Sequence, residues 1–446
     1  MIGPESNIGG RKMRFRRLTI VAAGWFTAGV AAQTVTAPYL PDSGDLEVRC
    51  GALIDGFAEQ PLDDRSVTIV AGRITEVAAG TADADLDLSD HTCLPGFIDT
   101  HTHIAEPIET ADLSIFYRIT TDELRAASRE NAKVTLEAGF TTVRNVGSYV
   151  GWSGRDLRDR INAGELVGPR MQIAGYYLTI PAGGGDLVIP GFDEADIPAR
   201  VRMGVARGPD AFRRKAEEAV AGTADVLKVI ASGAVLAFGG VPGAPEMTPD
   251  EIRAAVEVAH AANLKITAHA HGAQSIKDAI GAGVDSIEHA SLADDEAIAL
   301  AAAKQVAFSM DVYNGSYIGS IGREQGWPEE FIRKNDETTE AQRQVFTRAH
   351  TAGVPIIYGT DAGVYPHGDN ARQFAIMVER GMTEMEAIKA ATAVAAKYIG
   401  WSDDVGAIEA GRFGDLIAVR GDPLGDITLL EDIDVVIKGG LVFKQE

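Results

Sequence analysis

Between residues 94 and 400, short apolar segments alternate with longer segments of helical character. This alternation is typical of βα units around a parallel sheet, whose strands are apolar throughout because helices cover them. We expect strands at residues 94–103, 141–146, 171–176, 226–231, 265–271, 286–290, 306–310 and 355–360. Eight such units predict an α/β fold of the (β/α)8, or TIM-barrel, class.

Short strand-like segments also occur on both sides of the barrel segment. They lie at residues 48–54, 66–70 and 74–77, and again at 415–419, 435–438 and 441–443, separated by Gly, Asp and Pro turns. We expect the two ends of the chain to meet in one small β-sandwich domain. The predicted organisation is a β-sandwich from residues 46–93 plus 406–446 and a barrel from residues 94–400.

The first 32 residues have a different character from the rest. Arg14, Arg16 and Arg17 precede an apolar run that ends in small residues at Ala32. This order predicts a leader and secretory signal peptide over residues 1–32, cleaved after Ala32, and hence a secreted or periplasmic protein. The alternative is a membrane anchor, but an apolar run of about 15 residues is shorter than the roughly 20 that a spanning helix needs. We expect no membrane span in the mature chain.

The chain is acidic, with a formal net charge of −23 over 446 residues. A surface of this charge repels polyanions, which argues against nucleic acid as a partner. Cys50 and Cys93 are the two cysteines of the sequence. An oxidising compartment would permit a disulfide bond between them, but two buried thiols agree equally well with the sequence.

Potential metal ligands cluster at the ends of the expected strands. In barrels of this class the functional groups lie at the carboxyl ends of the strands. The candidates are His101, His103, Lys228, His269, His271, His289 and Asp361. A single histidine in an apolar strand is more often a hydrogen-bonded core residue, but these are five of the nine histidines, all at strand ends. Imidazole and carboxylate are ligands that zinc prefers, so the sequence predicts a metal site.

Five short motifs point to a family. The segment Leu-Pro-Gly-Phe-Ile-Asp-Thr-His-Thr-His at residues 94–103 resembles the first-strand signature of the amidohydrolase superfamily. Asp-Val-Leu-Lys at 225–228, Ala-His-Ala-His-Gly at 268–272, Ile-Glu-His at 287–289 and Gly-Thr-Asp at 359–361 extend the resemblance. The chain is most similar to the imidazolonepropionase-related subgroup, which includes Xaa-Pro dipeptidases, other carboxypeptidase-like enzymes and ochratoxin-hydrolysing amidohydrolases.

The resemblance implies two divalent metal ions, with zinc as the expected metal. His101, His103 and Asp361 would bind the more buried ion, and His269 and His289 the more exposed one. An ammonium group between two dications is electrostatically excluded, so we expect Lys228 to react with CO2 and bridge both ions as a carbamate. An ordinary lysine in a salt bridge is the alternative for Lys228.

Catalytic and substrate-binding residues follow from the same comparison. We expect Asp361 to be the base that accepts the proton of an activated water and returns it to the leaving nitrogen. His271 would donate to the substrate carbonyl oxygen, with a structural role as the alternative. Tyr313, His367 and Arg372 lie in the loops after the last two strands, where His367 or Arg372 would bind a substrate carboxylate unless both are solvated loop residues.

These features predict hydrolysis of N-acyl amino acids or dipeptides that carry a free C-terminal carboxylate, including ochratoxin-like N-acyl phenylalanines. Hydrolysis of a cyclic amide or imidazolone ring is the alternative activity, and a metal-binding scaffold without activity is the non-enzymatic one. Deamination is disfavoured because Gly272 stands where deaminases carry a glutamate. Relatives often have Gly-Gly-His-Gly after the third strand, whereas this chain has Ala-Gly-Gly-Gly at residues 182–185. By analogy the protein would form a homo-oligomer, specifically an octamer.

Overall fold

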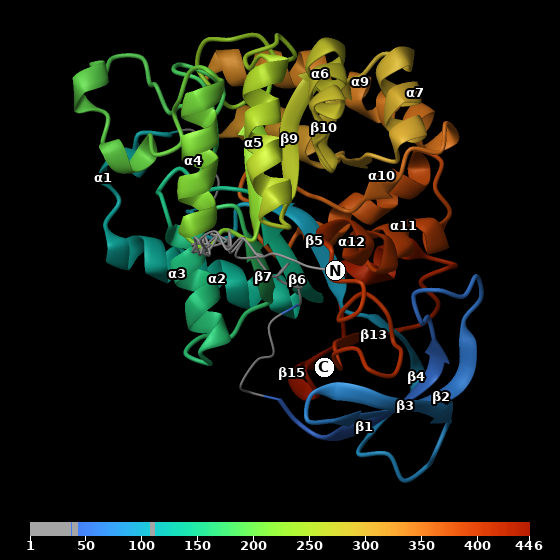
Figure 1. Ribbon diagram of the computed structural model, residues 1–446. Helices are drawn as coiled ribbons and strands as arrows, with labels where there is room; N and C mark the ends of the chain where they lie inside the picture. The colour runs from blue at the N-terminus through green and yellow to red at the C-terminus, as the bar shows by residue number, and fades with distance from the viewer. Residues whose placement is uncertain (1–36, 38–42, 108–111) are drawn as a thin grey trace, which may run out of the picture. The chain divides into compact units, whose positions relative to one another are not determined.

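The computed structural model describes residue 37 and residues 43–107 and 112–446 (Figure 1). The predicted leader and signal peptide, residues 1–32, lie outside the described residues. Within the described part of the chain, no helix combines the length and the apolar character needed to cross a membrane.

Eight parallel strands form the predicted barrel. They are β5 (Phe97–Thr102), β6 (Phe140–Asn145), β7 (Arg170–Ile173), β8 (Val226–Ile230), β9 (Lys265–Gly272), β10 (Ser286–Leu292), β11 (Ala307–Ser309) and β12 (Ile356–Ile357). Hydrogen bonds arrange them as β5-β6-β7 and β12-β11-β10-β9-β8. Bridges from Leu178 to Val229 and from Thr102 to Ala362 join the two groups into a closed ring. The TIM-barrel prediction is confirmed.

Helices follow the strands and cover the outside of the barrel (Figure 1). The longer ones are α2 (Thr121–Glu137), α3 (Ser153–Asn162), α4 (Pro209–Ala221), α5 (Pro249–Ala261), α6 (Ala273–Ala282), α7 (Asp295–Lys304), α9 (Glu329–Thr351), α10 (Gln373–Glu379), α11 (Glu384–Ala390) and α12 (Ala393–Ile399). Two single turns, α1 (Ile115–Arg118) and α8 (Asn314–Tyr317), lie in loops. Local sequence fixes the helix starts: α5 begins with a capping box between Thr248 and Glu251, with Pro249 in its first turn.

The period of a strand places the polar residues inside the barrel. Along β9, Ile266, Ala268 and Ala270 belong to the apolar core that the helices cover. His269 and His271, at the alternate positions of the same strand, therefore point to the opposite side, into the barrel. This alternation directs the predicted metal ligands of β9 into the barrel interior.

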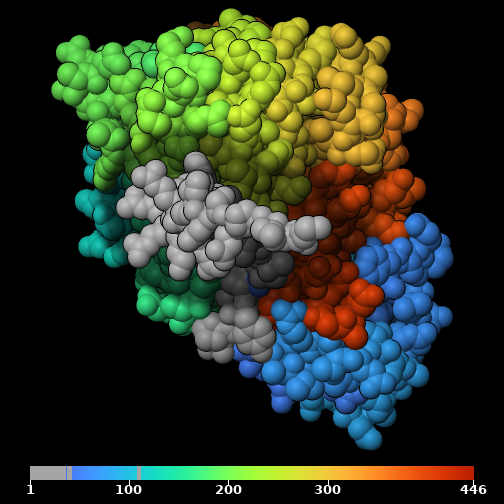
Figure 2. All heavy atoms as spheres, in the orientation of Figure 1, coloured from blue at the N-terminus to red at the C-terminus, as the bar shows by residue number. Residues whose placement is uncertain are grey.

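The two ends of the chain meet in one seven-stranded mixed sheet of order β15-β14-β13-β4-β1-β2-β3. Its strands are β1 (Leu46–Leu53), β2 (Leu62–Val70), β3 (Arg73–Ala79), β4 (Leu86–Pro95), β13 (Leu416–Arg420), β14 (Val435–Lys438) and β15 (Leu441–Gln445). Segments far apart in the sequence, blue and red in the figures, thus lie side by side (Figures 1 and 2). A terminal β-domain built from both flanking segments is present as predicted, and its strands belong to a single mixed sheet, where we expected a sandwich.

Two details of this sheet differ from the sequence analysis or go beyond it. The predicted first barrel strand, residues 94–103, is split, because Leu94 and Pro95 end β4 and the barrel strand begins at Phe97. The sequence analysis missed β4, in which polar residues interrupt the apolar pattern. Cys50 of β1 and Cys93 of β4 form a disulfide bond, which decides between the two alternatives left open for these residues.

Candidate active site

Three predicted ligands converge where β5 and β12 end. His101 and His103 are two residues apart, so both rings lie on the same face of the chain. Oδ1 of Asp361 lies 3.2 Å from Nε2 of His101 and 3.1 Å from Nε2 of His103. One carboxylate oxygen is thus shared between the two imidazoles.

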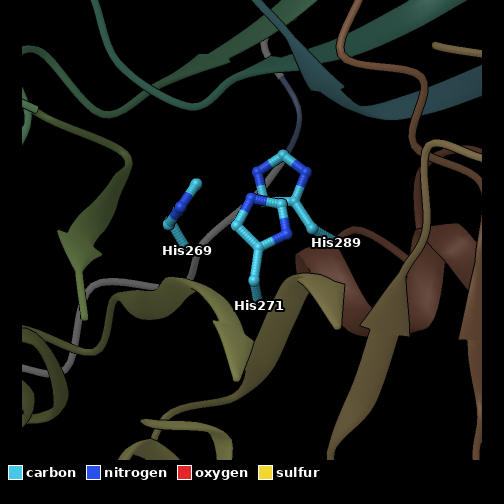
Figure 3. A group of neighbouring side chains, drawn as sticks. All are labelled: His269, His271 and His289. Atoms are coloured by element: carbon cyan, nitrogen blue, oxygen red, sulfur yellow. The ribbon is translucent and has the colours of Figure 1, made fainter. Parts of the chain in front are cut away.

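The histidines of β9 and β10 form a second group (Figure 3). The ring centroids of His269 and His289 are 4.5 Å apart, and the His271 ring stacks on His289 at 4.7 Å. Ligand atoms of these three residues lie within 4.8 Å of one another, as do those of His101, His289 and Asp361. His289 belongs to both of these sets of three residues, so the ligand atoms of the two sets are close enough for two neighbouring metal ions. Imidazole and carboxylate ligands of this kind fit zinc.

Lys228 lies on β8 among these ligands and is buried, with 2% of its surface exposed. Burial lowers the pKa of its amine to about 8, although Glu288 and Asp361 oppose this shift. No ion pair is found between Lys228 and any residue that the structure describes. The alternative of an ordinary salt-bridged lysine therefore lacks a partner in the described chain.

The backbone is strained at two of the predicted ligands. His289 and Asp361 have φ angles of 69° and 58°, in the left-handed region that residues other than glycine rarely adopt. Such conformations persist where surrounding contacts hold them, and they cluster at functional sites. Here Nε2 of Gln342 donates to the His289 carbonyl at 3.2 Å, and the amide of Asp361 donates to the His101 carbonyl at 2.8 Å.

Sequence reasoning gave no role to several polar residues that hold the ligands. Glu288 pairs with Nδ1 of His101 at 2.8 Å, and Asp311 pairs with Nδ1 of His289 at 2.9 Å. Nδ1 of His271 lies 2.9 Å from the hydroxyl of Ser291. Carboxylates and hydroxyls in these positions fix the tautomer and the orientation of metal-binding imidazoles. Asp311 follows β11 directly, so the strand-end rule could have identified it.

The pKa shifts of several predicted ligands favour the binding of cations. Burial raises the pKa of Asp361, but the His101 and His103 imidazoles outweigh it and hold that pKa well below its usual range. Burial and the neighbouring His289 lower the pKa of His271 to about 3, and the same causes hold the pKa of His269 well below its usual range. His269 and His271 are therefore neutral imidazoles, the form that binds metal ions. Burial lowers the pKa of His101, but Asp361 and Glu288 outweigh it and raise that pKa above its usual value.

One cavity contains the predicted ligands. It is lined by these ligands, Lys228 and His271, and also by apolar and aromatic residues that include Leu113, Phe116, Tyr149, Tyr177, Leu236, Ile318 and Trp327. Gly184 and Gly185, from the segment that departs from the family pattern, also line it. A Cβ at Gly185 would lie 2.8 Å from a side-chain carbon of Ile230, so a side chain there would need the wall to move.

The three loop residues predicted to bind substrate have another placement. Tyr313, His367 and Arg372 are not among the described residues that line the cavity. Arg372 is half-exposed and pairs with Asp369 at 3.3 Å, the Tyr313 ring packs on Tyr365 at 5.0 Å, and His367 is buried. Their assignment to the substrate stays a prediction that this arrangement does not support, whereas His271 does lie in the cavity.

Comparisons with known proteins agree with this geometry. The model of the amidohydrolase family matches residues 92–442. Ochratoxinase from Aspergillus niger is 30% identical over 382 residues, which cover 79% of this chain and 75% of ochratoxinase. The crystal structure of a Xaa-Pro dipeptidase with methionine bound in its active site superimposes with a TM-score of 0.84 at 35% identity, covering 90% of this chain and all of the other. The A. niger ochratoxinase structure gives a TM-score of 0.79 at 28% identity, covering 91% and 96% of the two chains.

Proposed function

The chain belongs to the amidohydrolase family and is a hydrolase of amide bonds, and from this premise we propose a more specific activity. We propose that it uses two divalent metal ions to cleave N-acyl amino acids or dipeptides that carry a free C-terminal carboxylate, including ochratoxin-like N-acyl phenylalanines. The observation that carries the proposal is the convergence of two ligand groups that share His289, with ligand atoms within 4.8 Å of one another in each.

The ligand set fits two zinc ions. His101, His103 and Asp361 would hold one ion, and His269 and His289 the other. Lys228 has a lowered pKa and thus a larger fraction of neutral amine, the form that reacts with CO2. A carbamate on Lys228 would supply the anion that links the two groups. When bound, two such ions would polarise the substrate carbonyl and lower the pKa of a water molecule toward neutrality.

The side chains around this site would carry the protons. Asp361 accepts the proton of the attacking water and returns it to the leaving nitrogen, so the C–N bond breaks with a neutral amine leaving. The Ser291 hydroxyl lies 2.9 Å from Nδ1 of His271, and with this hydroxyl as the donor the His271 proton is on Nε2. From there His271 donates to the carbonyl oxygen as negative charge develops on it.

The substrate class rests on the cavity and on the relatives. An aromatic and aliphatic lining, including Phe116 and Trp327, suits an apolar or aromatic side chain. A. niger ochratoxinase is named for its action on ochratoxin, and the Xaa-Pro dipeptidase at 35% identity holds an amino acid, methionine, in its active site. Both support a product amine that is an amino acid with its own carboxylate.

The decisive experiment compares kcat/KM for an N-acyl phenylalanine and for the same compound with its carboxylate converted to an amide, using protein loaded with zinc. We expect the free acid to react at least about tenfold faster. The amide would lose the attraction of a carboxylate to the two cations of the loaded site, and a charge-assisted contact contributes about 1.5–3 kcal/mol. A difference below threefold would replace this activity with a general amidase, and preference for cyclic amides would favour a ring hydrolase. No turnover of any amide with both ions bound would favour the scaffold alternative.

We further propose that the chain is exported and forms a homo-oligomer. The Cys50–Cys93 disulfide supports export, because such bonds persist mainly in oxidising compartments. The octamer rests on the resemblance alone, and light scattering of the purified protein tests it.

A further inference from the structure

Asn314, the first residue of α8, joins two buried carboxylates of the site. Its Nδ2 donates to Oδ2 of Asp361 at 3.0 Å and to Oδ2 of Asp311, also at 3.0 Å. Asp311 in turn pairs with His289, so this single amide links the proposed base to a ligand of the other group. Both acceptors are carboxylate oxygens, which can only accept, so the orientation of the Asn314 amide is fixed by its partners.

The other end of this amide has no partner. Oδ1 of Asn314 is buried and accepts no hydrogen bond from any described residue. An amide oxygen left unpaired in a protein interior is destabilising. Oδ1 of Asn314 differs from the other unpaired amide oxygens of the described residues, those of Asn162, Gln172 and Gln373, because Asn314 lines the cavity. Asn314 is 6% exposed. A donor supplied by a ligand in the cavity would satisfy Oδ1.

We propose that Asn314 makes the enzyme selective for secondary amides, with Oδ1 accepting the N–H of the scissile amide while Nδ2 holds Asp361 in place. The inference rests on the proposed function, in which Asp361 returns a proton to the leaving nitrogen. Asn314 is hydrogen-bonded to Asp361, so a nitrogen within reach of Asp361 is also close to the Asn314 amide.

The hydrogen bond from the substrate N–H to Oδ1 of Asn314 persists through the reaction. The proton from Asp361 bonds to the nitrogen lone pair, the electron pair of the broken C–N bond goes to that nitrogen, and the original N–H stays with it. A tertiary amide, such as an N-methyl amide or the Xaa-Pro bond of the dipeptidase relative, has no N–H and leaves Oδ1 unpaired, so the inferred selectivity separates this chain from that relative. Sites built to pair with a substrate donor discriminate against analogues that lack it.

A pair of substrates isolates this contact. We would measure kcat/KM for an N-acyl phenylalanine and for its N-methyl derivative, with the natural protein and with Asn314→Ala. The natural enzyme should prefer the N–H substrate at least about tenfold, as expected for one hydrogen bond to a buried acceptor. Asn314→Ala should slow both substrates, because Asp361 loses its donor, and should reduce the preference to within about twofold. Comparing the two ratios removes the steric effect of the methyl group.

Asn335 of α9 provides the matched control. It also lines the cavity, but its Nδ2 donates to the backbone oxygen of Gly315 at 3.0 Å and to neither carboxylate. Asn335→Ala should keep the preference for the N–H substrate. Asn314→Ser serves if Asn314→Ala folds poorly, and zinc content verifies that each variant retains its ions.

The outcomes separate the two proposals. If the preference persists in Asn314→Ala and in Asn314→Ser, the proposed contact does not exist, even though amide hydrolysis stands. If the natural enzyme hydrolyses neither substrate, the proposed function fails and this inference fails with it. If the variants bind both substrates without turnover, calorimetry gives the ratio of the two dissociation constants for each variant. A variant that still binds the N–H substrate at least about tenfold more tightly than its N-methyl derivative overturns the inference.

Discussion

Oε2 of Glu288 lies 2.8 Å from Nδ1 of His101, and both side chains are buried. The other oxygen of Glu288 accepts a hydrogen bond from Nη2 of Arg144 at 2.8 Å. This ion-pair contact favours a proton on Nδ1 of His101, and Nε2 of the same ring faces Asp361. Because Glu288 directly precedes His289 in β10, one strand end serves both ligand groups.

The first prediction removes the charge of Glu288. Glu288→Gln should weaken zinc binding by about 10- to 100-fold, since His101 loses the carboxylate that orients it. The variant should also unfold more easily, by about 3 kcal/mol or more, because Arg144 loses its buried partner. Competition with a chromogenic chelator measures the affinity, and urea unfolding of the metal-free protein measures the stability.

Glu246→Gln is the matched control for this variant. Glu246 accepts a hydrogen bond from the amide of Gly184 at 2.8 Å and has no contact with a proposed ligand among the described residues. Its zinc affinity should stay within about twofold of the natural protein. Unchanged affinity in Glu288→Gln would remove Glu288 from metal binding.

The second prediction tests the bridging role of Lys228. Natural protein should contain about two divalent ions per chain, and Lys228→Ala should lose zinc and activity together. Acetate or propionate should restore part of both, because a small carboxylate can occupy the space of the lost carbamate. Lys334 is the control: it is also buried, but its Nζ donates to the backbone oxygen of Ala237 at 2.7 Å, so Lys334→Ala should keep its zinc. A fully active Lys228→Ala enzyme would contradict the bridge.

The third prediction separates metal binding from proton transfer at Asp361. Asp361→Asn keeps one oxygen for an ion but loses the basic carboxylate, so part of the zinc should remain while turnover falls about 10²- to 10⁴-fold. Elemental analysis and kcat are measured on the same sample. Asp369→Asn, which changes a loop residue paired with Arg372, is the control and should retain turnover. Near-normal turnover of Asp361→Asn with both ions bound would exclude Asp361 as the base.

The barrel and the positions of its ligands could be predicted because both follow from the geometry of parallel strands. A strand that alternates Ala268, His269 and Ala270 has one face for the helices and one for the barrel interior, whatever the loops do. The same geometry brings the five strand ends that carry predicted ligands to one place, so residues as distant as His101 and Asp361 could be expected to meet. The strand-end rule extends to Asp311, to which we gave no role because its motif was interpreted through the neighbouring Tyr313.

Loop residues could not be placed in this way. Arg372 lies eleven residues beyond the end of the predicted site motif at Asp361. The direction of its side chain depends on the ion pair with Asp369, which strand periodicity does not predict. The pairing of Cys50 with Cys93 was likewise undecided. The disulfide requires the parallel contact of β1 with β4, and β4 was not predicted because polar residues interrupt its apolar pattern. Contacts between side chains of different loops and strands, such as that of Asn314 with Asp361, arise only in the folded chain.

The fourth prediction concerns pH and Glu106, which lines the cavity. Burial raises the pKa of Glu106 to about 8, although the amides of Val150 and Tyr149 oppose the shift. The folded chain thus favours the protonated form, and its contribution to stability is full below pH 4.5 and is lost as the pH rises through 8. Glu106→Gln removes this dependence, so its melting temperature relative to the natural metal-free protein should rise from pH 4.5 to pH 8. A constant difference over this range would show that Glu106 ionises normally.

The last prediction concerns the disulfide bond, first its contribution to stability and then its relation to the predicted signal peptide. The Cys50–Cys93 bond spans a sequence separation of 43 residues, and a closed loop of that size stabilises a chain by up to about 4 kcal/mol. Replacing both cysteines by serine should therefore lower the free energy of unfolding by about 2–4 kcal/mol, measured by urea unfolding of the metal-free protein.

The same bond reports where the chain folds. When the complete sequence is expressed in its own host, the folded protein should be recovered outside the cytoplasm, begin near Gln33 and contain no thiol that reacts with Ellman's reagent. N-terminal sequencing and thiol titration of one purified sample test both points, and the unfolded, reduced protein, with two reactive thiols, is the control. A cytoplasmic chain that retains Arg14 to Arg17 and carries two free thiols would contradict export, because the disulfide would then have neither the compartment that forms it nor a stabilising role in the cell.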